Sequence, residues 1–465
     1  MKTLRNLLMA AALLSPTAAL AVGPKYTAPN LAPVSLLNTA PEAVSKAQPE
    51  AAWWRTFKDP VLDDLIGRAL SANLDLRIAG DRVREARALF KDARLDQFPR
   101  ITSQADYTRS KEQTPGFGSA RTDLEAADIG FDAAWEIDLF GHVRHGVEAA
   151  RADAGAAEAD AHNAQVVVAA EVARSSFELR GAQARLAVAR QNAGTQQETL
   201  RLTKVRFQVG NGDPVDVDSA QARLSATEAT IPDLIAQEAR AGYRLAVLLG
   251  QRPGSLDAQL TAPANPAAPL IQPLPIGEAA DFLRRRPDVQ AAERRLAAET
   301  ARTGVATADL FPRIRVNGFV GLLSGDVSSL FSHGAQAWSV APSITWPALD
   351  MGGAHARLRA QQARGDSSLA AYDQTVLVAI EDLENALVSY RQQQLRIVSL
   401  SQQVQSSRSA AGLARIRYKE GGIDFLVLLD AERTRLAAED ALTLAQTDAN
   451  TDVVAIYKAL GGGWS

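Results

Sequence analysis

The 465-residue sequence contains no cysteine, which excludes disulfide bonds, thiolate metal sites and thiol catalysis. It has only five histidines, and aromatic residues make up only 6% of the chain. Neither sign of charge dominates, because 50 basic residues stand against 53 acidic ones, so the composition gives no indication of a nucleic-acid partner. The hydrophobic content of 46% is still enough for a sizeable core.

The first 21 residues form a separate unit. Lys2 and Arg5 precede an apolar run over 7–14, and Ala19-Leu20-Ala21 places small residues at the two positions that a signal peptidase reads. We therefore expect a cleaved signal peptide over 1–21 and a mature chain that starts at Val22. No later stretch reaches about 18 uninterrupted apolar residues, so a transmembrane helix is not expected, and a mature chain that crosses a membrane must do so with strands.

Two proline-free runs, His142–Gln208 and Gly353–Lys419, organise the rest of the chain. Both repeat apolar residues every seven positions, namely Val172, Leu179, Leu186, Ala193, Leu200 and Phe207 in the first and Leu383, Tyr390, Ile397, Val404, Ala411 and Tyr418 in the second. This period predicts two helices, each a rod of roughly 100 Å, that supercoil against neighbouring helices. A solitary coiled coil would show the same heptads, so the flanking segments must decide between the two interpretations.

The order of predicted elements repeats. Phe98-Pro99-Arg100-Ile101 returns as Phe311-Pro312-Arg313-Ile314, which is an offset of 213 (98 to 311), and Trp135 returns as Trp346 at 211 (135 to 346). The first repeat, 61–250, predicts a helix over 61–97, a strand hairpin over 100–139, the long helix 142–208 and a helix over 215–249. The second repeat, 276–465, predicts a helix, a hairpin over 313–347, the long helix 353–419 and a helix over 424–460. An extended segment over 22–60 precedes the repeats, and a proline-rich linker over 251–275 joins them.

Strict alternation of apolar and acidic residues predicts strands. It is clearest in Asp128–Leu139 and recurs in Ile101–Ser110, Arg313–Leu322 and Ala337–Trp346, whereas Lys111–Glu125 is expected to be a loop. Strands of about ten residues have the length of tilted membrane strands. Four strands cannot close a barrel and lipid does not tolerate open edges, so several chains must pool their strands, and three copies give twelve. A soluble four-stranded sheet on a helical bundle is the alternative.

Five motifs follow one another along nearly the whole mature chain: Val22-Gly23-Pro24-Lys25-Tyr26, Trp53-Trp54 with Phe57 and Asp59-Pro60, Asn73-Leu74-Asp75-Leu76-Arg77, Leu283-Arg284-Arg285-Arg286-Pro287-Asp288 and Leu460-Gly461-Gly462-Gly463-Trp464. Together they resemble the outer-membrane factor family, the TolC-like and OprM-like exit ducts of tripartite efflux pumps, nearest the NodT-type branch. The resemblance implies an α+β membrane protein with internal duplication. Its fold would be a homotrimeric 12-stranded transmembrane β-barrel, four strands per chain, continuous with a long periplasmic α-helical barrel.

The same resemblance implies a function and partners. The expected location is the outer membrane, with a long periplasmic extension. The expected role is passive conduction of drugs or other small toxic compounds to the exterior through a periplasmic gate that an adaptor opens. The partners would be a periplasmic adaptor (membrane fusion) protein, an inner-membrane efflux transporter and outer-membrane lipid. A duct for metal ions or secreted proteins, or a periplasmic structural coiled coil, remains as an alternative.

One position departs from the family pattern. Members of this branch usually carry a lipobox cysteine two residues before the valine of the Val-Gly-Pro motif, and Leu20 stands there in this sequence. We therefore expect ordinary cleavage after Ala21 and no lipidation.

Carried over by motif, the resemblance also places candidate site residues. Leu426 would form an apolar constriction, Asp430 an acidic ring and Arg433 a lock through charge pairing; the counterparts in the first repeat, which lack these charges, are Val215, Ser219 and Ala222. An ordinary surface pair between Asp430 and Arg433 is the alternative. Adaptor docking is expected at the turns of Val209, Gly210, Gly421 and Gly422. The aromatic residues expected at the lipid interface are Trp135, Trp338 and Trp346.

The sequence shows no constellation that supports catalysis, so we expect neither an enzyme nor a cofactor. His142 and His145 stand three residues apart at a helix start, with Glu148 as the sole further ligand at a convincing spacing. Solvated histidines explain this pattern better than a metal site. Gly461-Gly462-Gly463 lacks the lysine and helix that a phosphate loop requires.

Overall fold

A computed structural model describes residues 21–30, 36–38, 44–113, 121–260, 273–278 and 281–464. The expected signal peptide lies outside the described residues, apart from Ala21. The chain divides into two compact units. The sheet unit comprises Met1–Asn30, Arg82–Glu158 and Ala291–Gln374, and the hairpin unit comprises Leu31–Asp81, Ala159–Gln290 and Thr375–Ser465.

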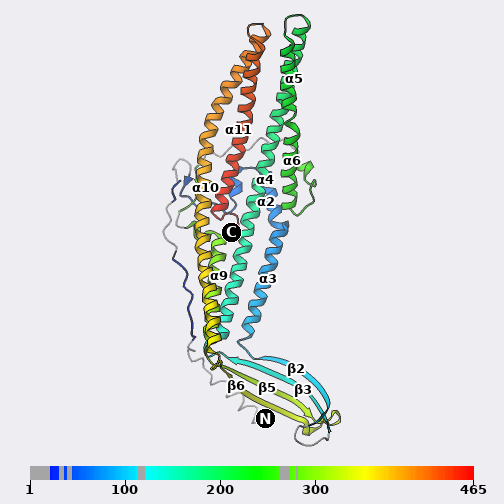
Figure 1. Cartoon of the computed structure of the whole chain (residues 1–465), viewed down its shortest axis with the longest axis vertical. Coiled ribbons are helices and arrows are strands. Elements are labelled where there is room, and N and C mark those ends of the chain that lie inside the picture. Colours follow the sequence, from blue (N-terminus) through cyan, green and yellow to red (C-terminus); the bar gives the residue numbers. More distant parts are fainter. Residues whose placement is uncertain are drawn as a thin grey trace. The chain divides into compact units, whose positions relative to one another are not determined.

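Two very long helices run through the fold (Figure 1). Helix α4 spans His142–Gln208, the bounds of its proline-free run, and α10 spans Met351–Lys419, beginning two residues before the expected start. Most heptad positions are buried, as Val172, Leu179 and Leu383 illustrate. The apolar seam therefore packs against neighbouring helices, as a seven-residue period requires.

The helix expected over 61–97 is interrupted. Helix α2 spans Pro60–Ala72 and α3 spans Leu74–Leu95. Between them the buried Asn73 caps α3, because its Oδ1 accepts hydrogen bonds from the backbone N–H groups of Asp75 (2.8 Å) and Leu76 (3.1 Å). Its Nδ2 also donates to the carbonyl oxygen of Leu248 at 2.8 Å, so the break is fixed by a partner 175 residues away.

The helix expected over 215–249 is interrupted as well. Helix α5 spans Pro214–Glu228 and α6 spans Ile231–Leu248. Pro232, the second residue of α6, has no N–H to donate to the carbonyl oxygen four residues earlier, which explains why one continuous helix does not form.

The second repeat keeps the first break with different chemistry, whereas its last helix is continuous. Its helices are α8 (Phe282–Arg285), α9 (Pro287–Ala308) and α11 (Phe425–Ala459). Arg286 occupies the position of Asn73 at the offset of 213 (73 to 286). Its guanidinium is buried and bonds Asp288 (2.6 Å), Asp382 (3.1 Å) and the carbonyl oxygen of Ala459 (2.9 Å). The arginine before the proline therefore joins three segments of the hairpin unit.

A small mixed layer completes the hairpin unit. Strand β1 (Val44–Ser45) pairs in parallel with β4 (Leu274–Pro275), and η2 (Trp53–Phe57) buries Trp53 completely. The Trp53 ring stacks on Tyr457 with centroids 5.1 Å apart. Helix α7 (Asp257–Leu260) lies within the expected linker, of which 261–272 is outside the described residues. The segment expected to be extended thus carries a core tryptophan.

The sheet unit contains one antiparallel sheet in the order β2-β3-β5-β6, with strands side by side in Figure 1. The strands are β2 (Arg100–Gln113), β3 (Arg121–Ile137), β5 (Arg313–Ser324) and β6 (Gln336–Thr345). The prediction of a loop over Lys111–Glu125 was wrong at both ends, because the pairing of β2 with β3 continues to Gln113 and Arg121. Cross-strand ion pairs Arg109–Glu125 (3.3 Å) and Lys111–Asp123 (3.6 Å) support this extension.

The register gathers apolar side chains on one face of the sheet. Phe131 faces Val320, which in turn faces Trp338, and these three side chains are 58%, 58% and 78% exposed. The opposite face is polar in β3, where Asp128, Asp132 and Glu136 alternate with the apolar residues. Among the described strands, β2 and β6 are the edges of the sheet. The described helices include none with a continuous apolar stretch that could span a membrane.

Candidate functional site

Two tight turns close the helical hairpins of the hairpin unit. Gly210 (φ +76°) follows α4 and Gly421 (φ +78°) follows α10, each in the left-handed region that favours glycine. The backbone N–H of Asn211 donates to the carbonyl oxygen of Arg206, and that of Gly422 to Arg417, each at 2.8 Å, as in a helix C-terminal Schellman motif. A Cβ at Gly210 or Gly421 would meet no atom within 4 Å, so both turns are open.

A hydrophobic cluster holds the two hairpins together near these turns. Its buried members come from α4, α5, α10 and α11, and include Leu200, Leu224, Tyr418, Phe425 and Leu428. The Tyr418 and Phe425 rings are 5.6 Å apart. Burial of several large side chains, at about 25 cal/mol per Å² of apolar surface, makes the paired hairpins one packed body.

Arg206 adds a polar contact between the hairpins. Its Nη1 donates to the carbonyl oxygen of Tyr418 at 2.8 Å, and its guanidinium lies over the Tyr418 ring, 4.6 Å from the centroid. Arg206 was not among the residues expected at a site. It aligns with Arg417 at the repeat offset of 211 (206 to 417), but the contact joins residues 212 positions apart and has no local signal.

The three residues expected at a gate share an exposed surface of α11. Leu426 is 64% exposed beside the buried Phe425, and Asp430 follows it one turn later. The Asp430 carboxylate pairs with Arg433 Nη2 at 2.8 Å, and both side chains are about two-thirds exposed. Within one chain, this is the i,i+3 surface pair that was the alternative. The structure brings the three residues together but gives them no further protein partner among the contacts described.

Two buried acids of α11 were not anticipated by the sequence analysis. Glu432, only 3% exposed, pairs with Arg415 of α10 at 2.7 Å. Glu439 pairs with Arg408 of α10 at 2.6 Å and with Arg435 at 3.0 Å. Because each buried carboxylate has a cationic partner, these pairs fix the register of α10 against α11 beside the gate residues.

Two further acids of α11, Asp448 and Asp452, have raised pKa values. Burial raises the pKa of Asp448, although Arg396 and a hydrogen bond from Gln393 oppose the rise. Burial, followed by the nearby Asp448, raises the pKa of Asp452 to about 6.

The expected interfacial tryptophans lie at the ends of the strands. Trp135 Nε1 donates to the carbonyl oxygen of Gln97 at 3.2 Å, and its repeat counterpart Trp346 donates to Leu310 at 3.0 Å. Both therefore mark the sheet end at which helices begin. Trp338 lies near the start of β6, toward the other end, and is 78% exposed.

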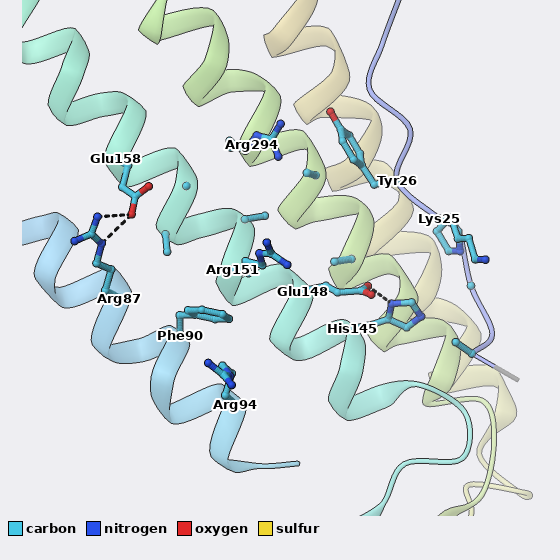
Figure 2. A pocket seen from close by; sticks show the side chains of 18 of the residues that line it. Lys25, Tyr26, Arg87, Phe90, Arg94, His145, Glu148, Arg151, Glu158 and Arg294 are labelled. Atoms are coloured by element: carbon cyan, nitrogen blue, oxygen red, sulfur yellow. Dashed lines mark hydrogen bonds and ion pairs between the residues drawn. The ribbon is translucent and has the colours of Figure 1, made fainter. Parts of the chain in front are cut away.

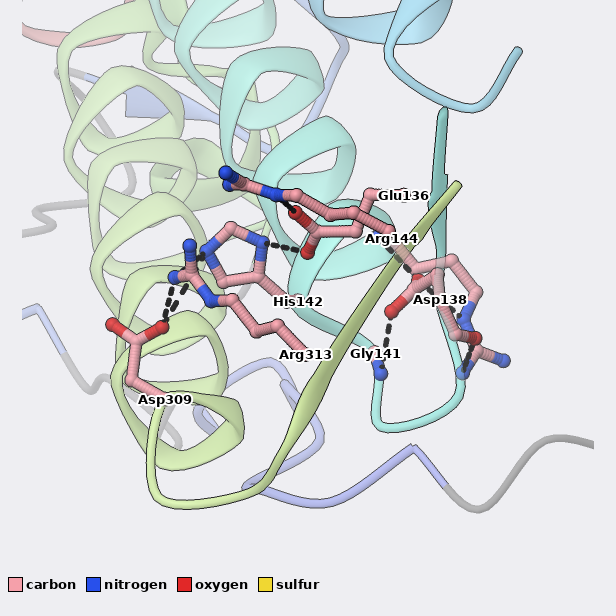
Figure 3. Close-up of polar contacts among 8 residues, drawn as sticks. Glu136, Asp138, Gly141, His142, Arg144, Asp309 and Arg313 are labelled. Atoms are coloured by element: carbon pink, nitrogen blue, oxygen red, sulfur yellow. Dashed lines mark hydrogen bonds and ion pairs between the residues drawn. The ribbon is translucent and has the colours of Figure 1, made fainter. Parts of the chain in front are cut away.

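His142, one of the two histidines expected to be solvated, contacts charged side chains at this junction (Figure 3). His142 Nδ1 contacts Glu136 at 3.1 Å, and its Nε2 lies 2.5 Å from Arg313 Nη2. Because the Arg313 guanidinium can only donate, Nε2 accepts from it, and Nδ1 lies within ion-pair distance of the Glu136 carboxylate. Arg313 also pairs with Asp309.

His145 has a different environment and is buried. Its Nδ1 bonds Glu148 at 2.8 Å, and its Nε2 bonds the carbonyl oxygen of Val22 at 3.1 Å. The two rings thus have separate partners, and within the described ranges no group of three His, Cys, Asp or Glu residues could hold a metal ion. The expectation of solvated histidines was wrong because the strand ends and the segment after Ala21 fold back onto the start of α4.

Comparison with known proteins identifies this architecture. The model of the outer membrane efflux protein family matches residues 65–251 and 279–462. The chain is 31% identical over 428 residues to the solvent efflux pump outer membrane protein SrpC of Pseudomonas putida, covering 91% of this chain and 89% of that protein. It is 30% identical over 448 residues to nodulation protein T of Rhizobium leguminosarum bv. trifolii, covering 96% and 94%.

A solved structure gives the same answer for the fold. The outer-membrane channel OprN superposes with a TM-score of 0.91 at 47% identity, covering 95% of this chain and 99% of that one. The chain therefore belongs to the outer membrane efflux protein family. Its fold is that of the outer-membrane channels, and its location is the outer membrane with a periplasmic extension.

Proposed function

We propose that this chain is the outer-membrane exit duct of a tripartite efflux pump and passively conducts small toxic compounds, such as drugs, to the exterior. The observation that carries the proposal is the combination of two helical hairpins built on the 67-residue α4 and the 69-residue α10 with a sheet that exposes one apolar face. Such a sheet suits lipid on one side and water on the other. The role requires no catalytic group, so the chain acts as a duct and not as an enzyme.

The duct is a homotrimer. In the described sheet β2 and β6 have free edges, and an edge strand in lipid would leave backbone groups without partners. Pairing of β2 with β6 of a neighbouring chain removes both edges. Three chains supply twelve strands, with Phe131, Val320 and Trp338 toward lipid. Trp135 and Trp346 then lie at the periplasmic interface, where the ring is apolar and the N–H is bonded.

The gate lies at the free end of the helical hairpins. Threefold symmetry brings three copies of Leu426 and Asp430 around one axis, with Arg433 available to offset the repulsion among the carboxylates. The Arg206–Tyr418 contact holds the α4–α5 hairpin to the α10–α11 hairpin and so opposes opening. Opening requires the hairpins to move apart at this end.

The partners are a periplasmic adaptor and an inner-membrane efflux transporter. The adaptor docks on the open turns at Val209–Gly210 and Gly421–Gly422, where 65% of Val209 is exposed. A solvent efflux protein among the relatives supports small organic cargo.

The test combines bilayer recordings with efflux in cells. The purified protein should insert into planar bilayers with a small single-channel conductance, and it should restore drug resistance in a strain that lacks its own duct but carries the cognate adaptor and transporter. Release of the protein from membranes without detergent would contradict the proposal.

A further inference from the structure

The sheet unit contains a cavity that the duct function does not use. It has a volume of about 890 Å³ and lies among α3, the first turns of α4, α9 and the segment after Ala21 (Figure 2). The side chains that matter most come from α3 and α4, namely Phe90, Lys91, Arg94 and Arg151. All of its lining residues belong to the sheet unit.

The cavity carries an excess of cations. Arg87 is neutralised by Glu158 at 2.8 Å, and Arg294 by Glu293 at 2.9 Å. Lys91, Arg94 and Arg151 form no ion pair with any described residue, and neither does Lys25, which lines the same cavity. Four unpaired cations around one cavity favour an anionic ligand.

The fold does not require these cations. Helix α9 repeats α3 at an offset of 213, and α10 repeats α4 at 211. The counterparts of Lys91, Arg94 and Arg151 are the uncharged Gly304 (91 to 304), Thr307 (94 to 307) and Gln362 (151 to 362). The second repeat builds the same helices without charge at these positions. The charges therefore serve something other than the packing of the repeat.

The cavity also offers an apolar wall. Phe90 points from α3 toward α4 in Figure 2, and the buried Ala297 and Ala301 of α9 line the same space. Arg94 lies over the Phe90 ring at 5.9 Å from its centroid. A ligand that matches this wall has an apolar part next to its anionic group.

The depth of the cavity fits a lipid headgroup. Arg94 stands three residues before Gln97, whose carbonyl oxygen accepts the hydrogen bond from the interfacial Trp135. On the other side, His145 lines the cavity three residues after α4 begins. Tryptophans of membrane proteins collect at headgroup level. The cavity thus begins within about one helical turn, roughly 5 Å, of that level.

We propose that the cavity binds the phosphodiester headgroup of a phospholipid of the periplasmic leaflet. Lys91, Arg94 and Arg151 bind the phosphate oxygens, and Phe90 packs against the glycerol and the first carbons of the acyl chains. The inference rests on the proposed function, because that function places the sheet in a bilayer. A bound lipid would secure the trimer at a fixed depth in the membrane.

The test measures lipid retention by native mass spectrometry of the delipidated trimer in mild detergent after addition of phosphatidylglycerol. The parent should retain lipid, whereas the triple variant Lys91→Gln, Arg94→Gln, Arg151→Gln should bind it roughly tenfold more weakly or worse, because it loses three cations next to the phosphate. The matched control Arg82→Gln, Arg357→Gln, Arg359→Gln removes three exposed cations of the sheet unit that lie outside this cavity, and it should retain lipid like the parent.

Further arms identify the ligand. Diacylglycerol with the same chains should not be retained, and its retention at the level of phosphatidylglycerol would overturn the role of the phosphate. Binding of inorganic phosphate without binding of phosphatidylglycerol would show that the ligand is not a lipid. Equal lipid retention by the two triple variants would show that this cavity is not the binding site. Single-channel recordings of the same samples test the duct function separately from lipid binding. A cavity variant that conducts normally but loses lipid is consistent with the duct function. A parent protein that never conducts would contradict the duct function.

Discussion

Asp430 and Arg433 pair at 2.8 Å on a surface that water reaches freely, so in one chain the pair is worth at most about 1 kcal/mol. Around a threefold axis the pair contributes more to closure, because without Arg433 the three Asp430 carboxylates would repel one another. Arg433→Ala should therefore splay the tip, and Leu426→Ala should widen the apolar ring. Both variants should raise single-channel conductance in planar bilayers.

The first repeat supplies the control for these variants. Val215 is the counterpart of Leu426 (215 to 426) and is 63% exposed, so Val215→Ala should conduct like the parent. Asp430→Ala removes both the repulsion among the carboxylates and their pairing with Arg433, so its conductance does not test the gate. Parental conductance of both Leu426→Ala and Arg433→Ala would show that the constriction lies elsewhere.

Arg206 gives a second test at the scale of the residue. Its hydrogen bond and its cation–π contact with Tyr418 are together worth about 1–3 kcal/mol. Arg206→Ala should loosen the tip and increase the time that the channel spends open. Its repeat counterpart Arg417 makes no such contact among the described residues, and Arg417→Ala is the control. Equal open times in the two variants would show that the Arg206–Tyr418 contact does not stabilise the closed channel.

Asp452 predicts a dependence of stability on pH. Its pKa of about 6 lies above that of an exposed carboxyl, so the folded state holds the proton more tightly than the unfolded state. The folded protein is therefore destabilised as pH rises from about 4 through 6. Because the side chain is only half-buried, solvent screening leaves an effect of about 1 kcal/mol per chain.

Asp452→Asn removes this penalty. The variant should unfold at a higher temperature than the parent at pH 8, and the difference should vanish near pH 4, as measured by thermal unfolding followed by circular dichroism. Asp440→Asn offers a contrast on the same helix. The Asp440 carboxylate pairs with Arg185 at 2.6 Å, so its removal should not stabilise the protein at either pH.

At the scale of elements, substitutions in the hairpin turns should affect adaptor docking without preventing folding. Gly210 and Gly421 adopt φ angles of +76° and +78°, where a residue with a side chain costs about 1 kcal/mol. A long helix pair tolerates that cost. Gly210→Leu and Gly421→Leu should abolish efflux in cells by obstructing the adaptor, while the trimer still assembles in detergent.

A glycine inside a helix provides the control for the effect of an added side chain away from the turns. Gly194 in α4 has open space beside it, since a Cβ at this position would meet no atom within 4 Å, and its φ is not positive. Gly194→Leu should therefore preserve efflux. Normal efflux from both turn variants would exclude the turns from the docking surface.

At the scale of the whole molecule, the absence of cysteine makes the trimer directly testable. Introduced cysteine pairs, with one at Thr102 of β2 and the other at Ser339, Ala341 or Ser343 of β6, all on the polar face of the sheet, should form disulfides between chains for at least one register. Denaturing gels should then show a ladder that ends at the trimer. The pair Ala134→Cys with Asn317→Cys lies in register within one chain and should give monomers. A stable monomer in lipid would contradict the assembly.

Much of the architecture could be predicted from the sequence because its signals are local and periodic. The seven-residue period of Val172, Leu179 and Leu186 predicted a supercoiling helix, and the proline-free run around it gave α4 its observed bounds. Alternation in β3 likewise assigned the apolar face that the register shows. Element ends were less predictable, and the hairpin β2–β3 is longer than expected because charged residues, which carry no apolar alternation, continue the pairing.

The sequence by itself therefore determined the long helices, the strand faces, the duplication and the family, since each depends on residue order alone. Only the tertiary structure decided the contacts between distant segments. Asn73 breaks a helix because the Leu248 carbonyl lies beside it, and Arg206 holds two hairpins together because Tyr418 lies opposite. The cations of the cavity likewise share a space because α3 and α4 pack side by side. Such contacts depend on where folded elements meet, and no periodicity in the chain encodes that position.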